Sequence, residues 1–99
     1  VQYIKEHFTD QDISVDKVSA EYGISVSYFS KTFNENVGMT FPEYVTELRM
    51  TYAYELLEQR PDLSIKKVAE LCGFNGVSYF SAQYKKKYGV SPSQGRKSR

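Results

Sequence analysis

Short hydroxyl side chains, an amide and several lysines recur at two places in this sequence, within and just after two copies of one five-residue stretch. The stretch Val-Ser-Tyr-Phe-Ser stands at residues 26–30 and again at residues 77–81. Lys31 and Asn34 follow the first copy, and residues 85–87, all lysines, follow the second. Hydroxyl, amide and ammonium groups can hydrogen-bond base edges in a DNA groove, and lysines also bind phosphate oxygens. The chemistry that these residues offer is therefore binding to a nucleic acid.

Two amphipathic helices would present these groups. The apolar positions in and after each copy have the i, i+3, i+7, i+11 spacing of a core-facing helical stripe. The stripe residues are Val26, Phe29, Phe33 and Val37 in the first unit, and Val77, Phe80, Tyr84 and Tyr88 in the second. The opposite sides then carry the polar groups, which are Ser27, Lys31 and Asn34 in the first unit, and Ser78, Ala82 and Lys85, flanked by Ser81, in the second.

A shorter helical segment precedes each of these helices and ends at a glycine. Ser14 is a candidate N-cap for the segment that ends at Gly23, and Ser64 for the segment that ends at Gly73. A short helix, a glycine turn and a second helix with a polar outer side form a helix-turn-helix. The two units match each other with an offset of 50 before the turn and 51 after it. We predict helix-turn-helix units at residues 15–37 and 65–88.

A longer helix must join the two units. The stretch Thr40-Phe41-Pro42-Glu43 has the form of a capping box with proline in the first turn, and Pro61 lies beyond the far end. Between them we predict a linker helix at residues 41–58, roughly 25 Å long. Its predicted apolar face consists of Tyr44, Leu48, Tyr52 and Leu56. Short helices at both ends complete an all-α fold of about seven helices in one domain, residues 1–99.

The charge is divided unevenly between the two halves of the chain. Residues 1–59 carry four basic and ten acidic side chains, a net −6, whereas residues 60–99 carry nine basic and two acidic ones, a net +7. This asymmetry predicts that the C-terminal half meets a polyanion. The alternative is an ordinary solvated surface.

Other classes of function find little support. With one cysteine, Cys72, and one histidine, His7, the sequence offers no disulfide, metal-ligand cluster or nucleophile–base pair. We therefore expect no enzyme activity, no catalytic residue, no metal and no cofactor. The apolar runs are too short to span a membrane and no signal peptide is visible, so we expect a cytoplasmic, nucleoid-associated location without membrane contact. A chain that begins at Val1 also suggests a piece of a longer protein.

Several stretches resemble one family. The strongest are residues 65–74 (IKKVAELCGF) and 78–81, followed by Lys85-Lys86, residues 89–92 and much of the linker at residues 44–57. They resemble the C-terminal DNA-binding domain of AraC/XylS-type bacterial transcription regulators, and within it the output domains of two-component response regulators. The resemblance implies two recognition helices in successive major-groove segments on one face of B-DNA, about 34 Å apart.

The resemblance also implies which residues contact DNA. The base-contact candidates on the two recognition helices are Ser27, Ser30, Lys31, Asn34, Ser78, Ser81, Ala82 and Lys85. The phosphate-contact candidates, at helix N-termini and in the basic half, are Ser14, Thr40, Ser64, Lys86, Lys87, Ser91 and Arg96. Ala82 replaces a long polar or basic residue of the family, and Gly95 replaces an aromatic one, so we expect weak base readout at the first and a frayed final helix at the second.

These observations predict sequence-specific binding to double-stranded DNA within a bacterial transcription regulator, with RNA polymerase and an N-terminal sensory or receiver domain as further implied partners. The alternative is a helical protein-interaction module whose basic C-terminal half docks an acidic partner. It predicts no preference for any DNA sequence.

Some single residues have plainer interpretations. For Tyr28 and Tyr79 we favour half-buried packing over a groove contact. We expect Arg49 to pair with a nearby acid or a helix end, His7 to lie at the surface or a helix end, and Cys72 to be a small core residue.

Overall fold

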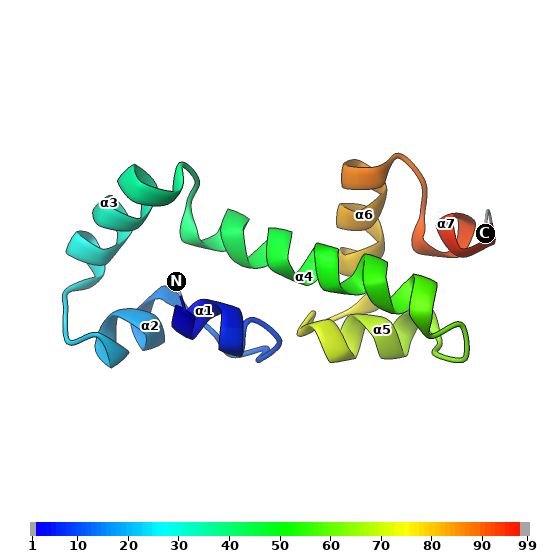
Figure 1. The fold of residues 1–99 in the computed structure, drawn as a ribbon, viewed down its shortest axis with the longest axis horizontal. Helices are drawn as coiled ribbons and strands as arrows, with labels where there is room; N and C mark the ends of the chain where they lie inside the picture. The colour runs from blue at the N-terminus through cyan, green and yellow to red at the C-terminus, as the bar shows by residue number, and fades with distance from the viewer. Residues whose placement is uncertain (1, 98–99) are drawn as a thin grey trace.

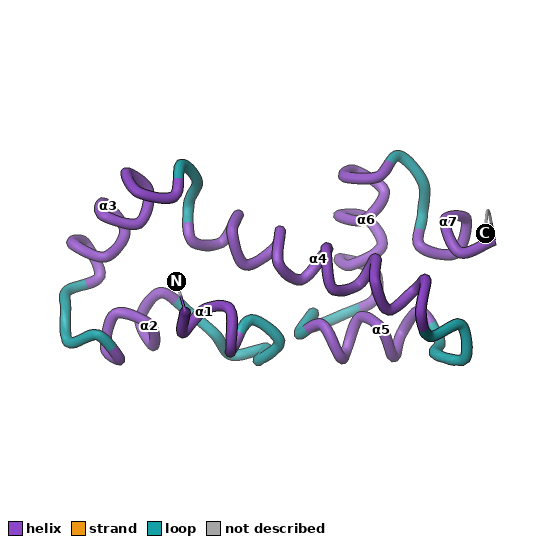
Figure 2. Tube along the Cα trace, in the orientation of Figure 1, coloured by secondary structure: helices purple, strands orange, loops and turns teal. Residues whose placement is uncertain are grey.

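All regular structure that the computed structural model describes is helical. The model describes the backbone of residues 2–97 and the side chains of residues 2–94. Its helices are α1 (Gln2–His7), α2 (Val15–Glu21), α3 (Val26–Val37), α4 (Phe41–Gln59), α5 (Ile65–Cys72), α6 (Val77–Tyr88) and α7 (Pro92–Lys97). Figure 1 shows their arrangement, and Figure 2 shows that only short loops connect them. The predicted all-α fold of seven helices is confirmed for this part of the chain.

Side-chain caps start most of these helices where the sequence predicts them. The hydroxyls of Ser14, Ser25 and Ser64 each accept a hydrogen bond from a backbone N–H three residues on. At the start of α4 the Thr40 hydroxyl accepts from the Glu43 N–H at 3.3 Å, and the Glu43 carboxylate accepts from the Thr40 N–H at 2.9 Å. This reciprocal pair is the predicted capping box. α6 differs, because Gly76 precedes it and supplies no side-chain cap.

The described hydrophobic residues form two separate cores, one at each end of α4. The first consists of Ile4, Val18, Phe29, Phe33, Phe41 and Val45. The second consists of Met50, Ala53, Leu57, Val68, Ala69, Cys72, Phe74, Phe80 and Tyr84. We call the two halves of the molecule built on these cores the first and second subdomains. α4 contributes its N-terminal half to the first and its C-terminal half to the second.

The predicted apolar face of α4 is therefore wrong in part. Tyr44, Leu48, Tyr52 and Leu56 are only half-buried, whereas Val45, Met50, Ala53 and Leu57 are buried. A single stripe fits a helix that packs on one core, but α4 packs on two cores that cover different sectors of its surface.

The stripes of α3 and α6 also begin later than predicted. Val26 and Val77 are each 38% exposed, whereas Phe29, Phe33, Phe80 and Tyr84 are buried. The two valines occupy the first position of their helices, beyond the edge of the core.

The molecule is elongated, measuring 44 × 21 × 21 Å, with the two subdomains at opposite ends of α4. In Figure 1, α2 and α5 lie along the lower edge, and α3 and α6 both rise from there to the upper edge. Repeated units in the sequence have therefore become repeated units in space, joined by a helix of 19 residues, about 28 Å long.

Candidate nucleic-acid interface

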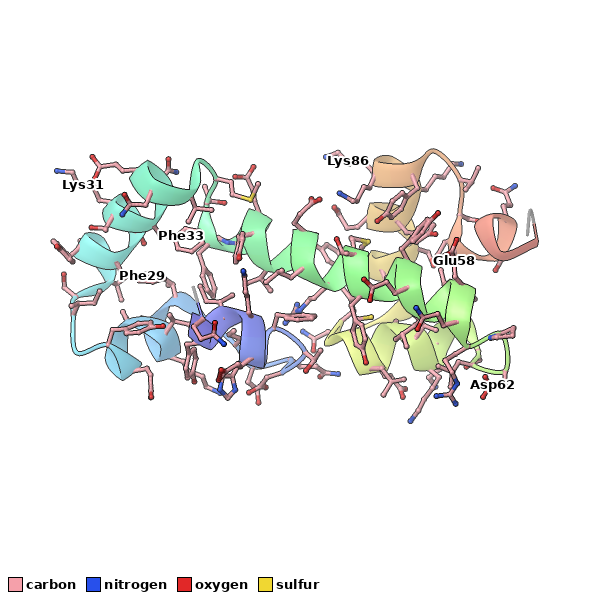
Figure 3. The ribbon with its side chains drawn as sticks, in the orientation of Figure 1. Phe29, Lys31, Phe33, Glu58, Asp62 and Lys86 are labelled. Carbon is pink, nitrogen blue, oxygen red and sulfur yellow. The ribbon has the colours of Figure 1, made fainter. Side chains whose placement is uncertain are left out.

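The outer side of α3 presents all four of its base-contact candidates to solvent. Ser27, Ser30, Lys31 and Asn34 are exposed, while Phe29 and Phe33 pack in the first core on the opposite side. Figure 3 shows Lys31 projecting away from these two rings. The ring of Phe33 lies 6.1 Å from that of Phe41, which anchors α3 to the start of α4. The exposed side of α3 is thus held on a rigid base.

The corresponding side of α6 is similar but less polar. Ser78, Ala82 and Lys85 are exposed, and Ser81 is half-buried. Lys86 is also exposed, and Figure 3 places it at the same edge of the molecule as Lys31. The methyl group of Ala82 gives this helix no hydrogen-bonding group at that position.

Lys87 behaves differently from its two neighbours. Its ammonium group pairs with the carboxylate of Glu47 on α4 and lies 5.6 Å from the ring centre of Tyr88. The ion pair ties the C-terminal end of α6 to the linker helix. To bind a phosphate, Lys87 would have to exchange Glu47 for it.

The candidate phosphate sites at helix N-termini fall into two groups. Ser14 lines a hollow together with Thr46 and Tyr79, and Thr40 lines another with Ser30 and Asn34, so both lie beside a recognition helix. Ser64 and Ser91 begin α5 and α7, which carry no base-contact candidate. The side chain of Arg96 lies outside the described residues.

Tyr28 and Tyr79 occupy equivalent places in the repeat, and the prediction that both are half-buried is wrong. Their exposed fractions are 61% and 54%. Each stands in the first turn of its recognition helix, at the margin between the core side and the outer side. Sequence spacing alone cannot separate packing from exposure at such a margin.

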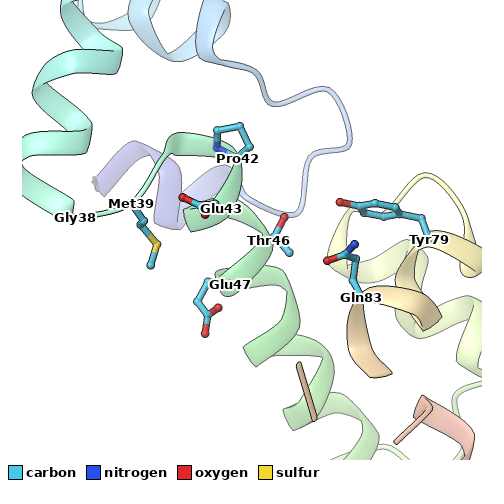
Figure 4. Close-up of a pocket in the computed structure, with 8 residues that line it drawn as sticks. All are labelled: Gly38, Met39, Pro42, Glu43, Thr46, Glu47, Tyr79 and Gln83. Atoms are coloured by element: carbon cyan, nitrogen blue, oxygen red, sulfur yellow. The ribbon is translucent and has the colours of Figure 1, made fainter. Parts of the chain in front are cut away.

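A groove that the sequence did not predict separates the two recognition helices. The turn after α3, at Gly38 and Met39, and the first turns of α4 line one side of it. Tyr79 and Gln83 of α6 line the other (Figure 4). On the α4 side Glu43 carries a negative charge, whereas the carboxylate of Glu47 is paired with Lys87. The Thr40 backbone N–H, and next its hydroxyl, lower the pKa of Glu43, so this carboxyl stays ionised at neutral pH. The i, i+4 spacing of Tyr79 and Gln83 was the signal in the sequence that could have indicated this surface.

Arg49 is structural, as expected, and of the two predicted kinds of partner it contacts not an acidic side chain but backbone carbonyls just after the end of α1. Its Nε donates to the carbonyl oxygen of Phe8 at 2.7 Å, and its Nη2 donates to that of Asp10 at 3.0 Å. Its guanidinium carbon lies 5.7 Å from the ring centre of Phe74. Burial lowers the pKa of Arg49 from its usual value, although a guanidinium remains charged in proteins.

His7 and Cys72, whose side chains are chemically reactive, both make structural contacts. His7 is exposed at the end of α1 and stacks on Tyr3 at 4.2 Å, which confirms its expected place. Cys72 is fully buried, as predicted, and burial raises the pKa of its thiol to about 12. Among residues 2–97, no helix is long and apolar enough to cross a membrane.

The arrangement defines a class of protein: a double helix-turn-helix domain with two exposed recognition helices on one frame. Comparison with known proteins gives the family. A family profile described as a helix-turn-helix domain matches residues 18–98. The chain belongs to the AraC/XylS-type family of helix-turn-helix transcription regulators.

Known relatives and structures agree with this assignment. The chain is 34% identical to a probable transcriptional regulator, LumQ of Photobacterium leiognathi, over 93% of its length and 36% of that protein. It is 36% identical to the C-terminal domain of AraT, a response regulator from Geobacillus stearothermophilus, covering 99% of this chain and 80% of that one with a TM-score of 0.91. The DNA-binding domain of AdpA, solved in complex with a target DNA, is 25% identical, with a TM-score of 0.91 and coverage of 98% and 86%. The chain spans about a third of the length of curated relatives such as LumQ.

Proposed function

We propose that this domain binds double-stranded DNA in a sequence-specific manner, as part of a bacterial transcription regulator, with α3 and α6 in adjacent major-groove segments. The observation that supports the proposal is that two equivalent helices with exposed outer sides rise to the same edge of the molecule. The long axis of 44 Å exceeds one helical repeat of B-DNA, about 34 Å, so the frame can reach both segments.

The two recognition helices would contribute unequally to base recognition. Lys31 and Asn34 on α3 suit the acceptor edge of guanine and the mixed edge of adenine, respectively, and the small Ser27 and Ser30 allow close approach. On α6, Ser78, Ser81 and Lys85 remain available, but Ala82 offers only an apolar contact, for instance with a thymine methyl. We therefore expect the half-site under α3 to carry more sequence information than the half-site under α6.

Phosphate contacts would supply much of the affinity. Lys86, with the helix N-termini at Ser14 and Thr40, flanks the recognition helices and suits the DNA backbone. Lys87, Ser64, Ser91 and Arg96 remain candidates of the same kind, with Lys87 depending on release from Glu47.

The wider context of the domain belongs to the same proposal. Relatives about three times as long, and the response regulator AraT, support a further N-terminal sensory or receiver domain in the complete protein. RNA polymerase as a partner and a cytoplasmic, nucleoid-associated location follow from a role in transcription. The family is one of DNA-binding regulators rather than of enzymes.

Selection of bound duplexes from a random pool tests the proposal. We expect an enriched motif of two unlike blocks, about one helical turn apart. Replacing Lys31 and Asn34 by alanine should erase the information in one block, and replacing Ser78 and Lys85 should erase it in the other. A pool without any enriched motif would instead favour the docking of an acidic protein by the basic C-terminal half.

A further inference from the structure

The two subdomains meet at a second place besides α4. The loop after α1, which belongs to the first subdomain, lies against the turn between α5 and α6 of the second (Figure 1). Three kinds of contact hold them together there. We call this set of contacts, made by residues 8–11, Arg49 and residues 73–74, the subdomain clamp.

Arg49 is the centre of the clamp. From its place in the middle of α4 it donates to two carbonyl oxygens of the loop, those of Phe8 at 2.7 Å and Asp10 at 3.0 Å. The guanidinium also lies over the ring of Phe74, with 5.7 Å between the guanidinium carbon and the ring centre. One side chain therefore contacts a backbone segment of the first subdomain and an aromatic ring of the second.

A hydrogen bond and a close approach of the two backbones reinforce this arrangement. Gln11 donates from Nε2 to the carbonyl oxygen of Phe74 at 3.3 Å. The backbones also approach so closely that a Cβ on Gly73 would lie 2.7 Å from the carbonyl oxygen of Thr9. Only glycine fits between them.

Both ends of the clamp lead directly to a recognition helix. The ring of Phe74 packs at a tilt against two rings of α6, with its centre 5.1 Å from that of Phe80 and 6.1 Å from that of Tyr79, so Phe74 connects the clamp to the start of α6. On the other side, Phe8 packs against the first core, to which Phe29 of α3 belongs. A shift at the clamp would move α6 relative to α3.

We propose that Arg49 is a positioning residue that fixes the separation and orientation of the two recognition helices, so that the domain accepts two half-sites at one spacing only. The proposal rests on the proposed function, because spacing has meaning only if both helices bind one duplex. When the half-sites have the correct spacing, a rigid connection keeps the second helix at a high effective concentration near its groove segment. When the spacing is wrong, the second helix cannot reach that segment. Arginine suits this role because its planar fork donates in two directions at once, which the single ammonium of lysine does not reproduce.

The geometric part of the proposal can be tested without DNA. Spin labels at Lys17→Cys on α2 and Lys67→Cys on α5, both exposed and outside the candidate DNA contacts, report the distance between the subdomains. The buried Cys72 is shielded from the label. We expect a narrow distance distribution for the parent chain, a broad one for Arg49→Met and an intermediate one for Arg49→Lys. Arg60→Met, which removes an exposed ion pair with Asp62 at the C-terminal end of the same helix, should leave the distribution narrow.

The functional part uses the DNA site selected for the parent chain and variants of that site with one or two base pairs inserted between the blocks. We expect Arg49→Met to lose about tenfold in affinity for the best spacing and much less on the inserted sites, so that the spacing preference flattens. Arg60→Met should keep the parent's profile. If Arg49 only stabilises the fold, its loss should weaken binding to all three duplexes equally. If it positions the two helices, its loss should change the ratio of the affinities for the three duplexes.

Narrow distances together with an unchanged spacing profile in a folded Arg49→Met would overturn the proposal. If that variant does not fold, Gln11→Ala, which removes the contact to Phe74 from the exposed side, must broaden the distances, and an unchanged distribution then refutes the clamp. If the parent chain selects no DNA motif at all, the proposed function fails, and the distances alone decide whether Arg49 positions the two helices.

Discussion

The repeat supplies its own control for measuring how tightly the two subdomains contact each other. Gly23 and Gly73 end the first helix of their units at equivalent places, with φ angles of 67° and 96°. A Cβ on Gly23 would meet nothing within 4 Å, whereas a Cβ on Gly73 would lie 2.7 and 2.8 Å from the carbonyl oxygen and carbon of Thr9. The same substitution by alanine therefore tests backbone strain alone at one position, and strain plus the contact between subdomains at the other.

The expected costs follow from these two geometries. Alanine in the left-handed region costs about 1–2 kcal/mol, of which about 0.4–1 kcal/mol is offset by the smaller freedom of the unfolded chain. Gly23→Ala should then destabilise the domain by about 1 kcal/mol. Gly73→Ala should cost a further 1–3 kcal/mol or so, because its methyl group meets backbone atoms that cannot rotate away. Gly89→Ala, at φ 81° in open space, controls for the wider φ angle of Gly73.

Urea unfolding followed by circular dichroism gives the three free energies of unfolding by linear extrapolation. Heating should give the same order, since 1 kcal/mol shifts the melting temperature of a domain of this size by about 4–8 °C. Equal losses for Gly73→Ala and the two control variants would refute the close contact between the loop after α1 and the turn before α6.

Further predictions concern three individual side chains. Lys31→Ala should cost about 1–3 kcal/mol on the selected site and little on random DNA, measured by fluorescence anisotropy, and equal losses on both would reassign Lys31 to the backbone. Lys86→Ala should make the dependence of log affinity on log salt shallower by about 0.9, while Lys17→Ala on α2 should not; an unchanged slope for Lys86→Ala would count against a phosphate contact. Cys72 should resist alkylation at pH 8 until the domain unfolds, because burial raises the pKa of its thiol to about 12, and rapid labelling of the folded protein, seen by mass spectrometry, would contradict its burial. Because that folded pKa lies above the unfolded one, the contribution of Cys72 to stability should be complete below about pH 9 and decrease between there and pH 12.

Local chemistry made most of the fold predictable from the sequence. Helix starts are predicted by residues whose side chains cap the first turn, here Ser25, Ser64 and the pair Thr40 and Glu43. The turns are predicted by Gly23 and Gly73, which have positive φ angles. Because the helix-turn-helix pattern occurs twice in the sequence, each helix predicted in one unit is also predicted in the other. The sequence therefore predicts the all-α fold, and the helices α2 to α6 lie close to the expected residue ranges.

Contacts between residues far apart in the sequence could not be predicted from local patterns. Arg49 and Phe8 are 41 residues apart, and Gln11 and Phe74 are 63 apart, so no periodicity connects them. The same limit explains the exposed valines, Val26 and Val77, which have the spacing of a core stripe but lie beyond the end of the core. It also explains Lys87, whose pairing with Glu47 depends on how α6 crosses α4. The exposure of Ser27, Lys31 and Asn34 could be predicted from the sequence because exposure on one side of a helix follows from burial of the other. Their role as base contacts comes from the family resemblance and stays a prediction.

A hydroxyl-radical footprint on the selected duplex tests most directly whether both recognition helices engage one DNA molecule together. If both helices bind one duplex, protected patches should lie on a single face of it, spaced by about 10 base pairs, and Lys31→Ala should weaken protection mainly at one end. Protection confined to one patch of about half a helical turn, with the other half-site as reactive as free DNA, would contradict it.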